Sequence, residues 1–416
     1  MDGTKPIALR HEPRFWAFLK GELKPKGPIF TPFNVVTVAI MATAAVILFY
    51  RFAYGLGTVS NLSQEFPWGL WIGFDVMTGV AFAGGAYVLT FMVYVLRQEK
   101  YHPIVRVTVL NGFLAYVFYA SALLLDLGRP WNVVNPIIGN SFGLTSVLFL
   151  VAWHFMLYMM AELVEFSPAI AEWLGWRRIH KVLNALTVGT VIFGITLSTL
   201  HQSALGSLYL MAKPKLHPLW YSELIPVLFF VSSIFAGLCM VIFEGSISHK
   251  VFHRRVGEDV EKSHDSIVLG LARIAAVVMF IYLFVMGLDL IHGQKLEHLV
   301  GGWGAWYLLE VALVVVPMIM LINGHRTGRV ALVKAGAGFA LLGILLNRLN
   351  ISIIAFKWYA PAHYVPTWME VVVTLAVISA ELWVFRWIVN RMPVLGPKPA
   401  WAETKAPEGR EAAVPA

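Results

Sequence analysis

The sequence has almost no cysteine: Cys239 is the only one in 416 residues. A single thiol cannot form a disulfide within the chain, supply the four ligands of an iron–sulfur cluster, or provide the CxxCH motif that attaches a c-type haem. Any iron–sulfur centre that works with this chain must therefore sit on a partner protein.

Charge is scarce as well, because charged residues make up 13% of the sequence and apolar residues 58%. Soluble domains carry about 25% charged residues, so this composition excludes a soluble globule and indicates a membrane protein with several spans. The net charge of +8 does not indicate a nucleic-acid-binding protein, because the basic residues fall between apolar runs and not on one face.

Ten apolar runs have about the length of a membrane-spanning helix. No cleavable signal peptide is predicted, because the first run begins near Phe33 without a small-residue cleavage pattern before it. Lys and Arg number 24 in the two tails and the even-numbered connections, but 5 in the alternate connections. By the positive-inside rule both termini are cytoplasmic, which requires an even number of spans. The predicted spans are 33–54, 70–96, 107–126, 143–165, 182–200, 223–246, 267–290, 303–322, 331–354 and 367–390.

The chain divides into three predicted segments. Residues 1–32 form a basic cytoplasmic tail in which Arg14–Leu23 is suited to an interfacial helix. Residues 33–392 form the ten-helix membrane domain. Residues 393–416, rich in proline, alanine and charge, form a disordered cytoplasmic tail.

A short internal echo suggests a duplicated plan. Spans 2 and 6 begin behind similar motifs, Pro67-Trp68 and Pro218-Leu219-Trp220, and four helices separate them. The sequence therefore predicts an all-α polytopic integral membrane protein with two four-helix bundles, spans 2–5 and 6–9, flanked by spans 1 and 10.

Asp75 is a carboxylate inside the second predicted span. At a rise of about 1.5 Å per residue it lies roughly 8 Å below the start of that helix, at a depth where ionisable groups usually serve a function. Trp68 and Trp71 frame the start of the span. The alternative is that these tryptophans only anchor the helix at the membrane interface and that Asp75 is a satisfied structural carboxylate.

The predicted orientation sorts the other polar groups by depth. The outer half is the richer one, which favours chemistry near the outer face. The outer candidates besides Asp75 are Asp126, Arg129, His201 and Gln202. The deeper candidates, considered for a proton path, are His154, Glu244, Glu310 and Arg348. Structural alternatives are an Asp126–Arg129 pair at a helix exit, a satisfied polar helix end at His201 and Gln202, an interfacial Glu244, and an ion pair of Arg348 with Glu310 or Asp75.

Haem binding and solute transport are two functions that these residues favour poorly. A haem b held by two histidines needs them at one depth on facing helices, and only His154 lies near the midplane, with His201 and His292 at the outer margin and His325 at the inner one. This excludes a di-haem arrangement and argues against a single haem. A secondary transporter binds its substrate on broken helices, and these spans have few Gly or Pro interruptions at mid-depth.

A lipid-soluble quinone suits the outer residues better. It needs a flat apolar slot open to the lipid, groups that hydrogen-bond its carbonyls, and acids that deliver protons. Trp68 and Trp71 supply walls, His201 and Gln202 supply hydrogen-bond donors, and Asp75 or Asp126 supplies protons.

Six stretches carry a resemblance to a known family. They are FPWGLWIGFDVMTGVAFAGGAYVL, YHPIVR, LLLDLGRPWN, the stretch from Leu197 to Leu208, HPLW and VIFEGS. In this order they resemble the NrfD-type, polysulfide reductase-like membrane subunits, and in particular the membrane subunit of the nickel–iron hydrogenase 2 type, often labelled a b-type cytochrome. The resemblance runs from the first span to the tenth.

The resemblance implies a subunit of the bacterial inner membrane that lacks a metal of its own. Such a subunit takes electrons from a periplasmic four-cluster iron–sulfur protein and reduces menaquinone or ubiquinone. The implied catalytic partner is a nickel–iron hydrogenase with large and small subunits, although related complexes serve polysulfide, nitrite or cytochrome c chemistry instead. A proton path from the inner side through Glu244, His154 and Glu310 is a separate hypothesis that rests on the positions of these residues. The family's quinone pocket corresponds to Trp68, Trp71, Asp75, Asp126, Arg129, His201 and Gln202.

Overall fold

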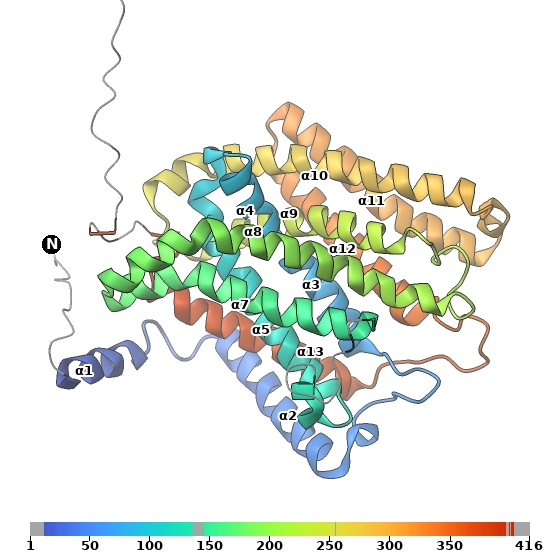
Figure 1. The fold of residues 1–416 in the computed structure, drawn as a ribbon, viewed down its shortest axis with the longest axis horizontal. Coiled ribbons are helices and arrows are strands. Elements are labelled where there is room, and N and C mark those ends of the chain that lie inside the picture. Colours follow the sequence, from blue (N-terminus) through green and yellow to red (C-terminus); the bar gives the residue numbers. More distant parts are fainter. Residues whose placement is uncertain are drawn as a thin grey trace, which may run out of the picture.

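The computed structural model describes residues 12–135, 143, 145–253, 255–396, 399 and 401–402. In this part of the chain the elements are helical, and an isolated bridge joins Leu216 to Phe356. Ten of the described segments are long and apolar enough to cross a membrane, which confirms the predicted number of spans. They lie side by side in an elongated bundle (Figure 1).

Several spans are composed of more than one helix. The second joins η2, α3, α4 and η3, the third joins η4 to α5, the fifth joins α8 to η6, and the ninth joins α12 to η8. The bounds in chain order are α2 Pro32–Tyr54, η2 Trp71–Thr78, α3 Gly79–Ala83, α4 Gly85–Thr90, η3 Phe91–Val95, η4 Glu99–Ile104, α5 Val105–Asp126, α7 Val147–Leu174, α8 Arg177–Ser207, η6 Leu208–Ala212, α9 Ile225–Val251, α10 Glu258–His292, α11 Gly302–Thr327, α12 Val330–Leu349, η8 Asn350–Ile354 and α13 Trp368–Val389. Outside the spans lie α1 Glu12–Leu23, η1 Leu56–Thr58, η5 Pro130–Val134 and η7 Leu296–Leu299.

Two four-helix bundles form the core, as predicted. The second span packs with α5, α7 and α8 in the first bundle, and α9, α10, α11 and α12 form the second bundle. The bundles meet where α9 contacts α3, α4 and α8. The remaining spans, α2 and α13, pack against each other and flank the first bundle.

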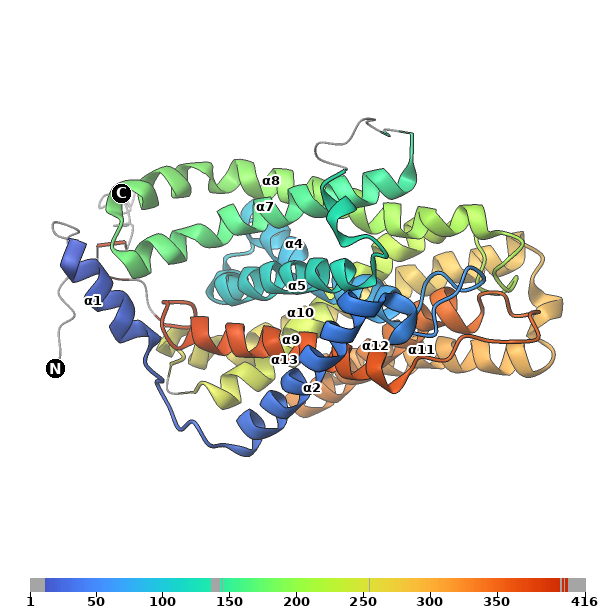
Figure 2. The ribbon, with the colours of Figure 1, turned by 90° about the horizontal axis from the view of Figure 1, so that it is seen from below.

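The two ends of the molecule differ (Figure 2). We call the end that carries α1 and the described C-terminal residues the tail end. We call the opposite end, with the connections 55–70, 213–224 and 355–367, the loop end. If the predicted orientation holds, the loop end faces the outside of the membrane.

The second span is the most enclosed helix of the fold and also the least regular. In an apolar stretch of 18 consecutive residues of this span 89% are buried, against 17% in the corresponding stretch of α2. It begins as a π-helix, in which the Thr78 hydroxyl donates to the carbonyl of Gly73 at 2.9 Å. Further along, Gly79 faces the Tyr119 ring so closely that a Cβ there would lie 2.2 Å from it. π-Helical turns occur often at functional sites, so this irregular segment marks a place to look for one.

The two bundles approach each other backbone to backbone. A Cβ on Gly237 of α9 would lie 2.1 Å from the backbone nitrogen of Gly85 in α4. Only glycine at both positions permits this approach, which is a usual device for close helix packing in membranes.

Several boundary predictions were wrong. The fifth span was expected to end at residue 200 but continues through η6 to Ala212, and the seventh was expected to begin at residue 267 but α10 begins at Glu258. The fourth and fifth spans were expected to end at residue 165 and begin at residue 182, but α7 continues to Leu174 and α8 begins at Arg177. The connection predicted for residues 166–181 is therefore mostly helix, and Gly175 turns the chain with φ +73°. The charged residues between 166 and 181 were interpreted as lying outside the membrane helices, but they are part of α7 and α8, which extend beyond the apolar runs.

The N-terminal tail contains the predicted helix, whereas the described C-terminal residues differ from the prediction. The predicted interfacial helix is present as α1, and Phe18 contacts Trp173 with ring centroids 5.5 Å apart. The C-terminal tail was expected to be disordered, but Val394 and Leu395 are buried and the Trp401 ring lies 5.3 Å from His180. Residues 1–11 and 403–416 lie outside the described residues.

Candidate functional site

Asp75 lies in η2 and is fully buried. Its Oδ2 accepts a hydrogen bond from Thr374 Oγ1 of α13 at 3.2 Å. Its Oδ1 has no hydrogen-bond partner among the described residues. A buried carboxylate with one free oxygen is costly in apolar surroundings, so it points to a missing partner such as water or a ligand.

The two tryptophans at the start of the second span have different surroundings. Trp71 is 2% exposed and donates from Nε1 to the carbonyl of Glu370 at 3.1 Å, so it is a core residue and not an interfacial anchor. Trp68 is half-buried, and its ring centroid lies 5.5 Å from that of Tyr209. Trp71 thus joins η2 to α13, whereas Trp68 packs against Tyr209 of η6.

The sequence suggested that Arg129 pairs with Asp126, but the arginine that lies near Asp126 is Arg51 of α2. Its side chain is 3% exposed; Nε donates to the carbonyl of Leu125 at 2.7 Å and a terminal nitrogen donates to Leu127. Arg51 also lies within electrostatic range of Asp126, whereas Arg129 is exposed and makes no ion pair with Asp126 in the described structure. A buried guanidinium therefore caps α5 and faces its last carboxylate.

A third acid, Glu370, lies close to Asp126 at the loop end. Glu370, in the first turn of α13, forms a capping box with Thr367 and accepts a hydrogen bond from the Tyr364 hydroxyl. The same hydroxyl accepts a hydrogen bond from the backbone nitrogen of Leu70 at 3.0 Å. Burial and the neighbouring Glu370 raise the pKa of Tyr364 above its ordinary value, so this phenol stays protonated at neutral pH.

The structure therefore brings three predicted residues into one cluster, which we call the loop-end acid cluster. Asp126 lies within electrostatic range of two other acids, Asp75 and Glu370. Sequence reasoning had not assigned Arg51, Tyr364 or Thr374 to the site. An arginine inside a span was the available signal for Arg51, whereas Tyr364 and Thr374 are ordinary residue types at such positions. The members of the cluster are Arg51, Trp71, Asp75, Asp126, Tyr364, Glu370 and Thr374.

His201 and Gln202 approach the second span from α8, inside the first bundle. The fully buried His201 donates from Nδ1 to the carbonyl of Val151 at 3.2 Å, and its Nε2 has no partner among the described residues. Gln202 donates from Nε2 to the carbonyl of Val80 at 2.9 Å, while its Oε1 is likewise unpartnered. Val80 follows Asp75 along the same span, so this pair and the loop-end acid cluster contact one helix from different neighbours.

The four deeper candidates do not form one group. His154 lies on α7 in the first bundle and is only partly buried. Glu244 of α9 accepts a hydrogen bond from Asn111 Nδ2 of α5 at 2.7 Å, so it lies where the bundles meet. Glu310 and Arg348 lie together in the second bundle.

Glu310 and Arg348 are joined through an amide and not by an ion pair. Glu310 accepts hydrogen bonds from Trp220 at 2.8 Å, Asn347 at 2.7 Å and Asn350 at 2.5 Å. Arg348 donates to Asn347 Oδ1 at 2.8 Å and to Ser232 Oγ at 2.7 Å, and its guanidinium lies 3.6 Å above the Phe229 ring. The predicted direct pairing of Arg348 with Glu310 or Asp75 was wrong, because Asn347 stands between the two charges.

These observations define a multi-pass membrane protein of two four-helix bundles with buried acids at the loop end of a central, irregular helix. Residues 58–357 match the family model described as "Polysulphide reductase, NrfD". The chain belongs to the NrfD family.

Curated relatives are similar over most of the chain. A protein of Nitratidesulfovibrio vulgaris (strain Hildenborough) is 41% identical over 378 residues, which cover 90% of this chain and 97% of that one. The probable Ni/Fe-hydrogenase 2 b-type cytochrome subunit of Escherichia coli (strain K12) is 32% identical, covering 89% and 92%. The integral membrane subunit of menaquinone reductase from Nitratidesulfovibrio vulgaris is 27% identical, covering 76% and 80%.

Proposed function

We propose that this chain is the quinone-reducing membrane subunit of a respiratory oxidoreductase complex. The relative named as a membrane subunit of menaquinone reductase supports the quinone. The relative named as a hydrogenase subunit supports hydrogenase as the catalytic partner, with its large and small subunits. The observation that carries the proposal is the free oxygen of Asp75, a buried acid on a π-helical turn beside other titratable groups.

The loop end is the proposed site of electron entry. A quinone becomes a quinol by taking up two electrons and two protons. The chain has one cysteine and its described residues form no cluster of metal-ligating side chains, so a partner iron–sulfur protein is the proposed source of the electrons. With the orientation predicted from Lys and Arg, this partner is a periplasmic four-cluster protein and the chain lies in the bacterial inner membrane with both termini cytoplasmic.

The residues near Asp75 have distinct proposed roles. Asp75 gives a proton to a quinone oxygen, and Asp126, whose Oδ1 is also unpartnered, resupplies it. Arg51 holds Asp126 in place, and Trp71 and Trp68 form apolar walls. Gln202 Nε2, which keeps a second hydrogen besides the one given to Val80, and His201 when Nε2 also carries a proton, donate hydrogen bonds to the other quinone carbonyl.

A haem on His201 does not fit the described side chains. The His201 imidazole is enclosed by Tyr116 and Phe155, with ring centroids 5.9 and 5.3 Å away. A macrocycle bound to Nε2 would have to displace these rings. We therefore derive no step through haem, although one relative carries the name of a b-type cytochrome subunit. The visible spectrum of the reduced, purified complex tests this point, since an α-band assigned to this chain would contradict it.

The test of the function uses Asp75→Asn in the complex purified through a tag on this chain. Reduced benzyl viologen serves as electron donor and a short-chain menaquinone as acceptor. Asparagine still accepts the hydrogen bond of Thr374 but carries no acidic proton, so the rate of quinone reduction should fall by about 100-fold, the lower range for loss of a general acid. Subunit composition and yield should not change.

The matched control is Asp265→Asn, because Asp265 is an exposed carboxylate on α10. It should leave the rate unchanged. An Asp75→Asn complex that reduces quinone at the wild-type rate would remove Asp75 from the mechanism. A wild-type complex that cannot reduce any quinone would refute the proposed function itself.

A further inference from the structure

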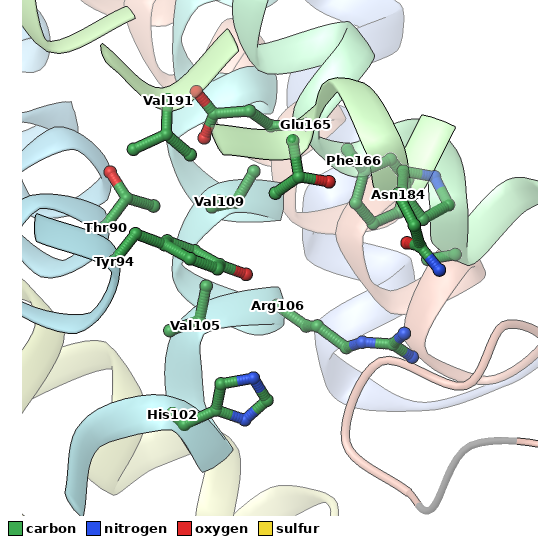
Figure 3. A pocket seen from close by; sticks show the side chains of 13 residues that line it. Thr90, Tyr94, His102, Val105, Arg106, Val109, Glu165, Phe166, Asn184 and Val191 are labelled. Atoms are coloured by element: carbon green, nitrogen blue, oxygen red, sulfur yellow. The ribbon is translucent and has the colours of Figure 1, made fainter. Parts of the chain in front are cut away.

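The loop-end acid cluster is closed to the surrounding lipid. Asp75 is fully buried, and Trp71 and Glu370 are at most 2% exposed. A pocket of about 80 Å³ lies elsewhere, at the tail end of the first bundle, and its wall contains Arg106 and Glu165 but no member of the cluster (Figure 3). Since a lipid-soluble quinone arrives from the bilayer, a helix around the cluster has to move to admit it.

The helices that touch Asp75 and Trp71 are poorly suited to move. The second span and α5 are packed within the first bundle. α13 is bonded to the second span twice, because Thr374 donates to Asp75 at 3.2 Å and Trp71 donates to the carbonyl of Glu370 at 3.1 Å. Movement of any of these helices would break contacts inside the cluster itself.

α2 covers the cluster from outside and is the least buried of the ten spans. In an apolar stretch of 18 residues 17% are buried, against 33% in α13. Among the other spans α2 packs chiefly against α13. Ala44 and Ile47 join Trp71 in a small apolar cluster, separate from the main core, to which α13 adds Val373 and Ala376. α2 therefore covers Trp71 without belonging to either bundle.

The tail-end half of α2 is bonded to α13. Asn34 Oδ1 accepts a hydrogen bond from Arg386 at 2.8 Å, and Thr37 Oγ1 accepts one from Trp383 Nε1 at 2.8 Å. Between Thr37 and Arg51 no side chain of α2 makes a hydrogen bond to another helix in the described structure. At about 1.5 Å per residue this part of α2 is roughly 21 Å long. α2 is thus anchored near the tail end and can pivot there.

Arg51 holds the loop end of α2 against the first bundle. Its guanidinium donates to the carbonyls of Leu125 and Leu127, at the C-terminal end of α5 where carbonyls lack partners within the helix. A cation at this end also interacts favourably with the helix dipole. Because Arg51 lies in the last turn of α2, its side chain can reach the water at the membrane surface when these bonds open. Release of α2 therefore leaves no charge in the lipid.

The chain that follows α2 can adapt to such a movement. Gly55 has φ +97°, and a Cβ on Gly55 or Gly57 would meet nothing within 4 Å. Fixed structure begins again at Val59, whose carbonyl accepts a hydrogen bond from the Thr367 hydroxyl at 2.8 Å. Residues 55–58 are therefore a loosely packed joint between α2 and the start of the anchored chain.

We propose that α2 is a lateral gate through which quinone enters from the lipid, and that Arg51 is the positioning residue that keeps the gate closed. The gate opens when Arg51 leaves the carbonyls of α5 and the loop-end half of α2 moves away from the first bundle. The ring of the quinone then passes over Trp71 toward Asp75, while its isoprenoid tail stays in the lipid between α2 and α5. The entering molecule is identified by the proposed function, on which this inference rests.

The gate itself is tested without quinone, with the full chain in nanodiscs and a small aryl diazirine dissolved in the lipid. On illumination the diazirine forms a carbene that labels the side chains that lipid reaches, and mass spectrometry locates the label. Trp71, 2% exposed, is the probe. Trp220 is the matched control, because it is 4% exposed and packs against Trp303 and Tyr307 of the second bundle.

Arg51→Gln should increase the label on Trp71 relative to Trp220. Glutamine can replace one of the two hydrogen bonds, and the loss of one bond to a charged group corresponds to about tenfold in the ratio of open to closed molecules. Arg51→Lys keeps the charge, so its increase should be smaller. Arg326→Gln, at an exposed position on α11, should leave the label unchanged.

Two results would overturn the role of Arg51. One is a ratio of label on Trp71 to label on Trp220 that is the same in the wild type and in Arg51→Gln. The other is an equal increase at both tryptophans, because it would show that the substitution loosens the whole protein and does not open a gate.

The entry route is tested in the wild-type complex during quinone reduction, with a menaquinone analogue that carries a diazirine on its isoprenoid tail. The label should fall on the loop-end half of α2 and on α5, including Leu48 and Leu125, which pack around the small apolar cluster. Label confined to α7 and α8 or to the second bundle would overturn the gate. Quinone reduction in the same sample would then still support the proposed function, whereas its absence would count against that function.

Discussion

Asn347→Leu is the sharpest test of how the second bundle holds two opposite charges apart. The Asn347 side chain donates to Glu310 and accepts from Arg348, so leucine of similar size removes two hydrogen bonds to charged groups. Such bonds contribute about 1.5–3 kcal/mol each in water-soluble proteins, whereas those measured within membranes reach about 1.7 kcal/mol. The two ranges overlap near 1.5 kcal/mol, which gives a total loss of about 3 kcal/mol.

Other bonds limit the loss to that size. Glu310 keeps Trp220 and Asn350, and Arg348 keeps Ser232. Neither charge is therefore left without a partner, and the larger cost of an isolated buried ion does not arise.

The single cysteine provides the assay. Cys239 is completely buried, so a thiol-reactive fluorogenic maleimide reports unfolding as SDS is titrated into detergent micelles. A loss of 3 kcal/mol lowers the equilibrium constant for folding about 100-fold. The control is Asn323→Leu, on an exposed face of α11. If Asn347→Leu unfolds at the same SDS fraction as this control, the amide does not hold the pair and the two charges must be stabilised in another way.

Two further predictions concern packing and pH. Gly237→Ala should destabilise the protein by about 3 kcal/mol, the upper range for overpacking, because its Cβ meets the backbone of α4. The control is Gly245→Ala on the same helix, where a Cβ meets nothing within 4 Å. It should unfold like the wild type in the same SDS titration. Burial and the neighbouring His298 lower the pKa of His217 to about 4. His217 in the unfolded chain binds a proton near pH 6.5, whereas in the folded chain it stays neutral down to about pH 4. The free energy of unfolding should therefore decrease as the pH falls from 6.5 toward 4. His217→Asn should show a smaller decline in the SDS midpoint between pH 7.5 and pH 5, and a decline equal to that of wild type would contradict the assignment.

The sequence predicted the features that depend on one helix at a time. Run length gave the ten spans, and the depth of Asp75 in its run indicated a buried carboxylate. What the sequence could not show is which helix each face meets.

The failures have the same origin. Arg129 follows Asp126 by three residues, which suggested a local pair, but Arg51 reaches Asp126 from a helix 75 positions earlier in the chain. The four deeper candidates share a depth range, yet helix packing distributes them over two bundles and the contact between them. The extra turns of α7 and α8 were missed because charged residues mark the edge of the apolar run and not the end of a helix.

The position of the second span has a consequence for biosynthesis. This helix leaves the ribosome early, but its partners come much later: Gly237 of α9, Ser352 beside Gly73, and Thr374 on Asp75. During insertion Gly85 lacks its partner Gly237 until about 150 more residues have been translated, and Asp75 lacks Thr374 until nearly 300 more have been. The contacts of the second span, at the centre of the protein, are thus the last to form. A chain truncated before α13 would leave Asp75 without its hydrogen-bond donor Thr374, even if the first bundle had formed.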